Sequence, residues 1–179
     1  GCINDTYEPG STFKTASMIV ALEEGIVKPS DIIDVGDGTY QFYNATMRDH
    51  NYRDGGYGKI TATEVIQYSS NVGISKIIND FYEKKPEKFV DRLYAMRLNE
   101  AINIEIPGVG APYIPHPKDE DVLWDKTKLP WMAIGYNTAI PPIYTLMFYN
   151  AIANEGKMIK PFLVKGYSKN GEVLKTFQT

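Results

Sequence analysis

The 179-residue sequence predicts an α+β domain in which helices outweigh strands. Four segments carry apolar residues at the spacing of a helix, whereas the segments that favour strands are short and bounded by turn residues. Apolar residues make up 43% of the chain, which is enough for a sizeable core in one domain or in part of one.

The first predicted helix covers Thr12–Glu24. Pro9 and Gly10 break any preceding element, the residues that follow are largely apolar, and Gly25 ends the pattern. We therefore expect Ser11 at or just inside the N-terminus of this helix.

Short strands are predicted at residues 32–35 and 39–43, joined by the glycine-rich turn between them. The polar stretch at residues 44–58 contains two adjacent glycines and is predicted to be a loop.

A long helical pattern begins after this loop, with Thr61 as its cap and Glu64 in its first turn. Its apolar residues are spaced for a wide buried face that continues to Phe81. Gly73 lies inside the pattern and argues against one unbroken helix.

The second half of the chain alternates regular and irregular segments. Helices are predicted at residues 86–96 and 143–154, and the proline-rich stretch 106–130 between them is predicted to be irregular. Residues 162–177 predict a hairpin around the Asn170-Gly171 turn.

Charge and hydropathy exclude several classes of protein. The formal charge is −3 and the charged residues form no long runs of one sign, so we expect no nucleic-acid partner. No apolar run approaches the ~18 residues that a transmembrane helix needs, so we expect no transmembrane segment within these residues.

Cysteine and histidine content argues against a metal site. Cys2 is the only cysteine, which excludes an internal disulfide and a thiolate cluster. His50 and His116 are far apart in sequence and would have to converge with carboxylates such as Asp49 or Asp54. Solvated loop positions are the simpler expectation for these residues, and no metal or cofactor is predicted.

The Ser11-x-x-Lys14 motif places a hydroxyl and an amine on one side of the first helix. Free N–H groups at a helix start stabilise developing negative charge, and a lysine kept partly neutral by burial can take a proton from serine. A serine after Pro-Gly is also an ordinary helix cap, and a lysine on a solvated face is unremarkable. Phe13, Met18 and Leu22 indicate that this helix is largely buried, so we expect Lys14 to be buried as well.

A second motif, Ser69-Ser70-Asn71, places a hydroxyl and a carboxamide two residues apart at a possible helix junction. Such a pair can hand on protons and hold an amide. The simpler alternative is a turn or a helix-capping pair.

The two motifs together resemble the penicillin-binding proteins, the serine D,D-transpeptidases that cross-link peptidoglycan. The segments around the two motifs resemble those of the monofunctional class B members: Glu8-Pro9-Gly10-Ser11-Thr12-Phe13-Lys14 and Ser69-Ser70-Asn71-Val72-Gly73. An acidic residue before Pro-Gly, here Glu8, is similar to the pattern of the cell-division branch. Ala133-Ile134-Gly135-Tyr136 is similar to the stretch that approaches the family's third motif.

The resemblance spans nearly the whole chain and implies a partial transpeptidase domain over residues 1–179, of the penicillin-binding and β-lactamase-like fold. Family members usually carry Gly-Tyr-Gly where this chain has Gly135-Tyr136-Asn137. No Lys-Thr-Gly or Lys-Ser-Gly is present, and Lys175-Thr176 is followed by Phe177. The N-terminal strands, the membrane anchor and the strand that carries the third motif are therefore expected to lie outside this sequence.

The resemblance implies a role for each matching residue. Ser11 would attack the D-Ala-D-Ala bond of a stem peptide, and Lys14 would be its general base. Ser69 would relay a proton to the leaving amine, while Asn71 would hydrogen-bond both Lys14 and the peptide backbone. Gly135 and Tyr136 would contribute to substrate binding.

The implied partners are peptidoglycan stem peptides, β-lactam antibiotics and, in the parent protein, cell-division proteins. The implied location is the periplasmic face of the inner membrane, with the parent anchored in that membrane. His50, which lies beside Asp49 and Arg48, is a candidate contact to the acceptor peptide or an ordinary loop histidine.

The alternative function is a non-catalytic penicillin-sensing or scaffold domain. Sensor domains and class D β-lactamases typically carry Ser-x-Val where this chain has Ser69-Ser70-Asn71, and class A β-lactamases carry Ser-Asp-Asn. Since the second oxyanion donor is expected from the missing strand, we expect the chain alone to be a poor catalyst.

Overall fold

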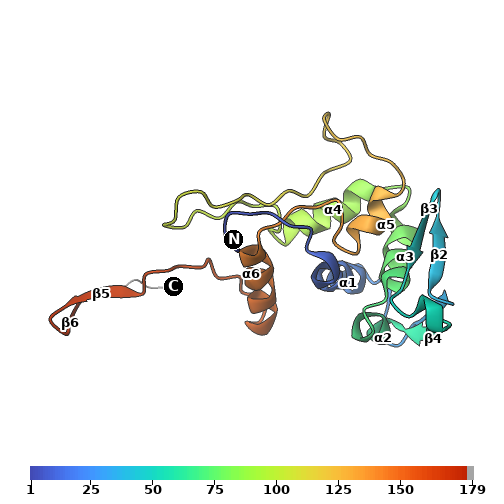
Figure 1. The fold of residues 1–179 in the computed structure, drawn as a ribbon, viewed down its shortest axis with the longest axis horizontal. Coiled ribbons are helices and arrows are strands. Elements are labelled where there is room, and N and C mark those ends of the chain that lie inside the picture. The colour runs from blue at the N-terminus through green and yellow to red at the C-terminus, as the bar shows by residue number, and fades with distance from the viewer. Residues whose placement is uncertain (177–179) are drawn as a thin grey trace.

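The computed structural model describes residues 1–176. Its centre is α1 (Lys14–Glu23), which follows directly on the 3₁₀ turn η1 (Gly10–Phe13). Figure 1 shows α1 between α6 (Pro142–Ala153) on one side and α3 (Asn71–Tyr82) with the strands of residues 32–61 on the other. The chain therefore forms a mixed α and β structure, as predicted.

The core lies where α1 and α3 meet, and it also takes in α4 (Pro86–Ala95) and α5 (Lys128–Met132). The side chains at its centre are fully buried and come from all of these helices: Val20, Ala21, Val72, Ile74, Ile78, Phe89, Leu93 and Met132. Burying a side chain of this size stabilises the fold by about 1.5–3 kcal/mol. Lys14 on α1 and Asn71 on α3 are thus mounted on helices that form the core.

The four N-terminal strands form two antiparallel pairs, which differ from the prediction. β1 (Ile32–Gly36) pairs with β4 (Gly58–Thr61), and β2 (Thr39–Phe42) pairs with β3 (Ala45–Arg48). The prediction of a loop over residues 44–58 was therefore wrong at both ends, because β3 lies near its start and β4 begins at its last residue. Its strand residues are too polar to show an apolar alternation, and the partner of β1 lies beyond an intervening hairpin.

The predicted long helix is two helices, α2 (Ala62–Gln67) and α3. Thr61 caps α2 as predicted, because its hydroxyl accepts from the Glu64 N–H while the Glu64 carboxylate accepts from the Thr61 N–H. The break lies at Ser69, whose φ is +54°, so the helix junction expected at the Ser69-Ser70-Asn71 motif is confirmed, and Gly73 lies inside α3. A Cβ at position 73 would lie 2.7 Å from Val65 Cγ2, so this glycine allows α2 to pack closely on α3.

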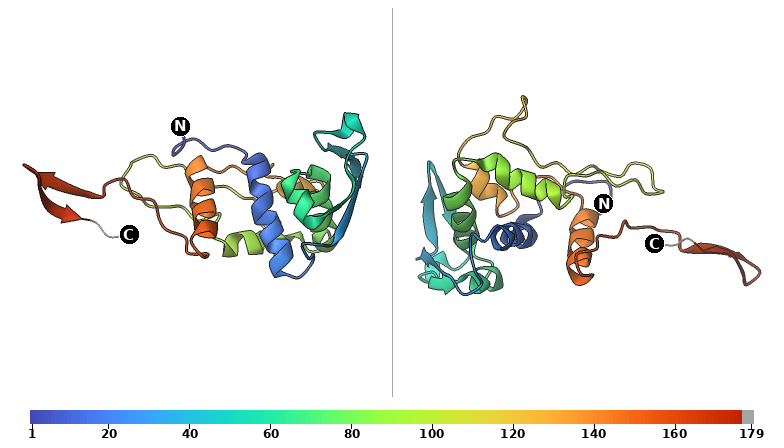
Figure 2. Two further views of the ribbon diagram at one scale, coloured as in Figure 1. Left: turned by 90° about the horizontal axis from the view of Figure 1, so that it is seen from below. Right: turned by 180° about the vertical axis from the view of Figure 1, so that it is seen from behind.

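The C-terminal part extends away from this body, as both views in Figure 2 show. The predicted hairpin is confirmed as β5 (Gly166–Lys169) and β6 (Glu172–Thr176), joined at Asn170 and Gly171 with φ angles of +51° and +85°. Positive φ at both turn residues is the geometry that Asn-Gly adopts readily. The predicted hairpin residue Phe177 lies outside the described part.

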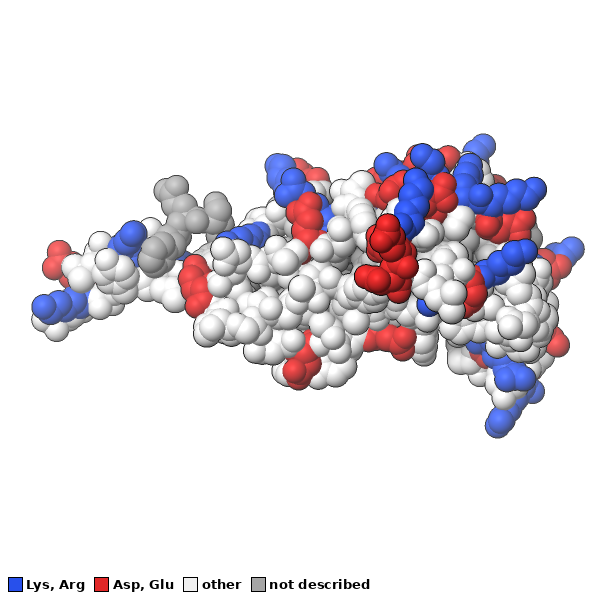
Figure 3. Space-filling view, turned by 90° about the horizontal axis from the view of Figure 1, so that it is seen from above, with Lys and Arg blue, Asp and Glu red and all other residues white. Residues whose placement is uncertain are grey.

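The surface carries charges of both signs. On the face in Figure 3, basic and acidic side chains are interspersed and do not form a field of one sign. Within residues 1–176, the helices are all too short or too polar to cross a membrane.

Candidate active site

Ser11 lies in η1, one residue after Gly10, which has a φ of +55°. The Ser11 carbonyl accepts the Lys14 N–H, so the 3₁₀ turn leads directly into α1. The Ser11 side chain is exposed, whereas Phe13 and Lys14 beside it are buried. The predicted position of Ser11 at the helix start is therefore confirmed, and the residue is exposed.

The turn that carries Ser11 is supported by the segment after α5. The Gly10 N–H donates to the Gly135 carbonyl at 3.2 Å, and the Asn137 N–H donates to the Glu8 carboxylate at 2.8 Å. Gly135 has a φ of +81°, and a Cβ there would lie 2.3 Å from the Gly10 carbonyl oxygen. Gly135 therefore holds the Ser11 turn through its backbone. The side chain of the next residue, Tyr136, does not take part in these contacts, and the residue is 45% exposed.

Lys14 is buried, with 2% of its surface exposed. Its ammonium donates to the Ser69 carbonyl at 2.5 Å and to Ser69 Oγ at 2.9 Å. Burial lowers the pKa of Lys14 to about 8, and the nearby charge of Asp49 opposes that shift. The expectation of a buried lysine is confirmed.

Ser69 lies at the junction of α2 and α3 in the left-handed conformation. A non-glycine residue held there costs about 1–2 kcal/mol, and such strain persists only where the surroundings over-determine it. The bonds from Lys14 to the Ser69 carbonyl and hydroxyl are two of those constraints. Two of the predicted site residues, 55 positions apart in the chain, are thus in direct contact.

Asn71 has a different partner from the one predicted. Its side-chain Nδ2 donates to the Arg48 carbonyl at 2.8 Å, at the end of β3. The expected hydrogen bond to Lys14 does not occur among the described residues, because the Lys14 ammonium is directed to Ser69. Asn71 instead ties the start of α3 to the β2–β3 hairpin.

Asp49 is the site residue that sequence reasoning missed. It was expected on a solvated loop, but 1% of its surface is exposed. Its Oδ2 accepts from the Ser70 hydroxyl at 2.8 Å and its Oδ1 accepts from the Val72 N–H at 2.9 Å. The signal was the alternation along β3, because Met47 faces inward and Asp49 is two residues further on.

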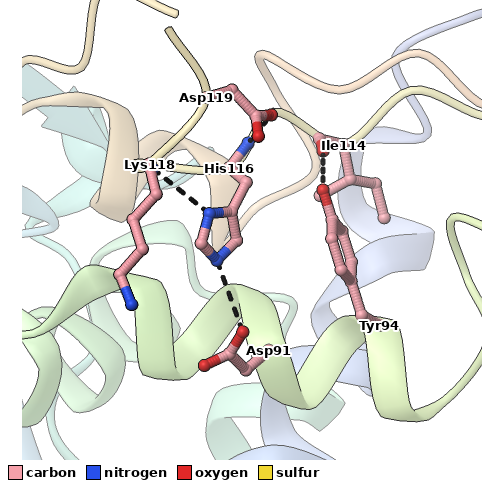
Figure 4. A network of polar contacts seen from close by, with 6 residues as sticks. All are labelled: Asp91, Tyr94, Ile114, His116, Lys118 and Asp119. Carbon is pink, nitrogen blue, oxygen red and sulfur yellow. Dashed lines mark hydrogen bonds and ion pairs between the residues drawn. The ribbon is translucent and has the colours of Figure 1, made fainter.

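The two histidines lie in separate places. His50 is exposed, and its Nε2 is 2.9 Å from the Tyr57 hydroxyl. Figure 4 shows His116 in a second network, where its Nε2 is 3.3 Å from Asp91 and its Nδ1 accepts from the Lys118 N–H. The His116 side chain is only 12% exposed, so the prediction of a solvated position was wrong for this residue.

No group of three or more His, Cys, Asp or Glu side chains that could hold a metal ion occurs within residues 1–176.

Solved structures show the same fold. This chain superimposes with a TM-score of 0.79 on a peptidoglycan glycosyltransferase from Burkholderia ambifaria, at 27% identity over 98% of this chain and 52% of that one. The TM-score is also 0.79 against the TP domain of Burkholderia pseudomallei penicillin-binding protein 3, at 26% identity over 96% of this chain and 48% of that one.

The family model of the penicillin binding protein transpeptidase domain matches residues 1–178. The chain belongs to this family, and the resemblance carried by the two motifs is confirmed.

Curated relatives agree with this assignment. They include the probable peptidoglycan D,D-transpeptidase PbpC of Pseudomonas aeruginosa, 28% identical over 94% of this chain and 28% of its own length. The peptidoglycan D,D-transpeptidase FtsI of Escherichia coli is 26% identical over 86% of this chain and 24% of its own length. The chain thus spans about a quarter of the length of these relatives.

Proposed function

We propose that this chain carries the serine, the lysine and the Ser-x-Asn part of the active site of a peptidoglycan D,D-transpeptidase of the class B, cell-division type. The observation that carries the proposal is the buried Lys14 ammonium, which lies one helical turn after an exposed Ser11 and contacts Ser69. The similarity to relatives named as D,D-transpeptidases supports the same activity.

In the proposed reaction, Ser11 Oγ attacks the carbonyl carbon between two terminal D-alanines. Its proton passes to neutral Lys14, and a bond forms between Oγ and that carbon. Collapse of the tetrahedral adduct breaks the C–N bond, and the leaving D-alanine takes a proton through Ser69. The amine of a second stem peptide then attacks the ester, forms the cross-link and releases Ser11.

The pKa of Lys14 suits this role. With a pKa of about 8, roughly a tenth of Lys14 is neutral at pH 7, compared with well under a thousandth for an ordinary lysine. The acylation rate should therefore rise with pH and level off above about pH 8. Lys14 keeps a contact to Ser69 Oγ, which gives the proton a route onward.

The chain by itself should acylate weakly. One oxyanion donor would be the Ser11 N–H, and the family's second donor lies on the strand of the Lys-Thr/Ser-Gly motif, which residues 1–179 do not contain. Losing one such donor typically costs ~10²–10³ in rate.

We also propose that the parent works at the periplasmic face of the inner membrane, with stem peptides, β-lactams and division proteins as its partners.

The test is intact mass spectrometry after incubation with a penicillin, on this chain and on the full-length gene product. A single adduct on the full-length protein, absent in Ser11→Ala, supports the proposal. Ser30→Ala is the matched control, because Ser30 is exposed and lies beyond α1, and it should keep the adduct.

Two outcomes would contradict the proposed transpeptidase activity. An adduct without turnover of a D-Ala-D-Ala peptide would indicate a penicillin sensor. No adduct on either protein would favour a scaffold.

A further inference from the structure

We propose that Asp49 is a positioning residue that anchors the residues after Ser69, through Ser70 and Val72, and thereby keeps Ser69 in place opposite Lys14. The inference rests on the proposed function and adds a fifth residue to its site. Nothing in the two motifs themselves points to this carboxylate, because it lies 20 residues before Ser69.

The contacts of Asp49 are directed at the middle of the Ser69-Ser70-Asn71 turn and at the residue that follows it. One carboxylate oxygen accepts from the Ser70 hydroxyl and the other from the Val72 N–H. The Ser70 hydroxyl oxygen in turn accepts from the Gly73 N–H at 2.9 Å, so the same hydroxyl caps α3 and donates to Asp49. Both oxygens of the carboxylate are therefore used on the first turn of α3.

Asp49 is itself fixed by the β2–β3 hairpin. Its N–H donates to the Gly38 carbonyl at 2.7 Å, and a Cβ at position 38 would lie 3.3 Å from the Asp49 Cβ. The residue before it, Arg48, accepts from Asn71 through its carbonyl. Two consecutive residues of one strand end thus hold two of the three motif residues.

This arrangement explains how Ser69 keeps its left-handed conformation. The residues that follow it are anchored by Asp49 and Arg48, and the residue itself is bonded to Lys14. Without the carboxylate, the turn would lose the anchors of Ser70 and Val72, and Ser69 could relax away from the ammonium.

The charge of Asp49 acts on the same lysine. Among the charged groups on the surrounding elements, it is the one whose charge acts appreciably on Lys14, and it favours the ammonium form. The others are engaged or exposed: Glu64 caps α2, Lys76 on α3 donates to the Asp34 carbonyl, and Arg48 and His50 are exposed. The charge of Asp49 therefore opposes the lowering of the Lys14 pKa by burial.

The first test measures the titration of Lys14 by NMR of the labelled ammonium group in this chain. Asp49→Asn removes the charge, and its amide can still accept from Val72 and donate to Ser70. The midpoint of the Lys14 titration should fall by about one pH unit. Asp54→Asn is the matched control, an exposed carboxylate further along the same loop, and should leave the midpoint unchanged. An unchanged midpoint in Asp49→Asn would overturn the electrostatic part.

The second test separates position from charge on the full-length protein. Ser70→Ala removes one contact of the carboxylate and leaves its charge, so penicillin acylation should fall at least tenfold while the titration midpoint stays. In Asp49→Asn, the acid limb of the acylation rate should move to lower pH. If Asp49→Asn does not fold, as circular dichroism would show, Ser70→Ala decides the question.

The outcomes distinguish the two proposals. Acylation by the wild type together with unchanged rates in Ser70→Ala and an unchanged pH profile in Asp49→Asn would overturn the role of Asp49 alone. Absence of any adduct on the wild type would overturn the proposed function and this inference with it.

Discussion

The junction of α1 and α3 and the C-terminal segment that begins with α6 are built in opposite ways. At the junction two buried serines are paired with backbone carbonyls, since Ser17 donates to the Ala133 carbonyl and Ser75 to the Pro130 carbonyl. On α6, Leu146 is 58% exposed and Ile152 46% exposed, although the helix is apolar on every side. Rigid packing thus coincides with the candidate site, and α6 offers apolar surface that the described residues leave uncovered.

The difference teaches how the site keeps its geometry. A buried lysine and a strained serine are costly, and they persist only where neighbouring groups fix them from several sides. The α1–α3 junction supplies those neighbours, whereas the C-terminal hairpin is exposed along nearly all of both strands. The same substitution should therefore lower the free energy of unfolding more at the α1–α3 junction and its supports than in the C-terminal segment.

The largest contrast is expected between two glycines of similar backbone conformation. Gly135→Ala should destabilise the protein by about 2–5 kcal/mol and abolish penicillin acylation, because its φ is +81° and its Cβ would collide with the Gly10 backbone. Gly156→Ala, after α6, has a φ of +80° and open space around it, and should cost only about 1–2 kcal/mol. Chemical denaturation measures both, and equal losses would contradict the proposed support of the Ser11 turn.

Two isoleucines test the packing of the helices. Ile78→Ala on α3 should lower the free energy of unfolding by about 2–5 kcal/mol, because the side chain is fully buried. Ile152→Ala on α6 should change it by less than about 0.5 kcal/mol. Urea titration of the two variants gives the comparison. A large loss in Ile152→Ala would show that the outer face of α6 is covered in solution.

The smallest effect expected is a dependence of stability on pH that comes from Lys14. Its pKa is about 8 in the folded chain and near 10.5 when unfolded, so the unfolded state binds more protons between these values. The free energy of unfolding should rise by about 1 kcal/mol from pH 8 to pH 9. The raised pKa of Tyr82, about 12, acts in the opposite direction but only above about pH 10.

Lys14→Met should remove this rise. Denaturation curves of both proteins at pH 7, 8 and 9 provide the measurement. A rise of the same size in Lys14→Met would assign the effect to another group and contradict the lowered pKa.

The sequence by itself determined the family, the two motifs and most of the helices. Ser11-x-x-Lys14, the Thr61 cap and the Asn170-Gly171 turn are all set by residues within one turn of each other, so local physics decides them. The burial of Lys14 also followed from the apolar character of its helix. These predictions required no knowledge of which segments meet in space.

The tertiary structure decided the rest. The left-handed conformation of Ser69, the partner of Asn71 and the burial of Asp49 depend on contacts across 21 to 55 residues. Those contacts depend on which strands pair, and the pairing of β1 with β4 skips a whole hairpin. A local pattern names the groups that could react, but only the packing of distant segments fixes which of them touch and how strongly the pKa of a buried lysine is lowered.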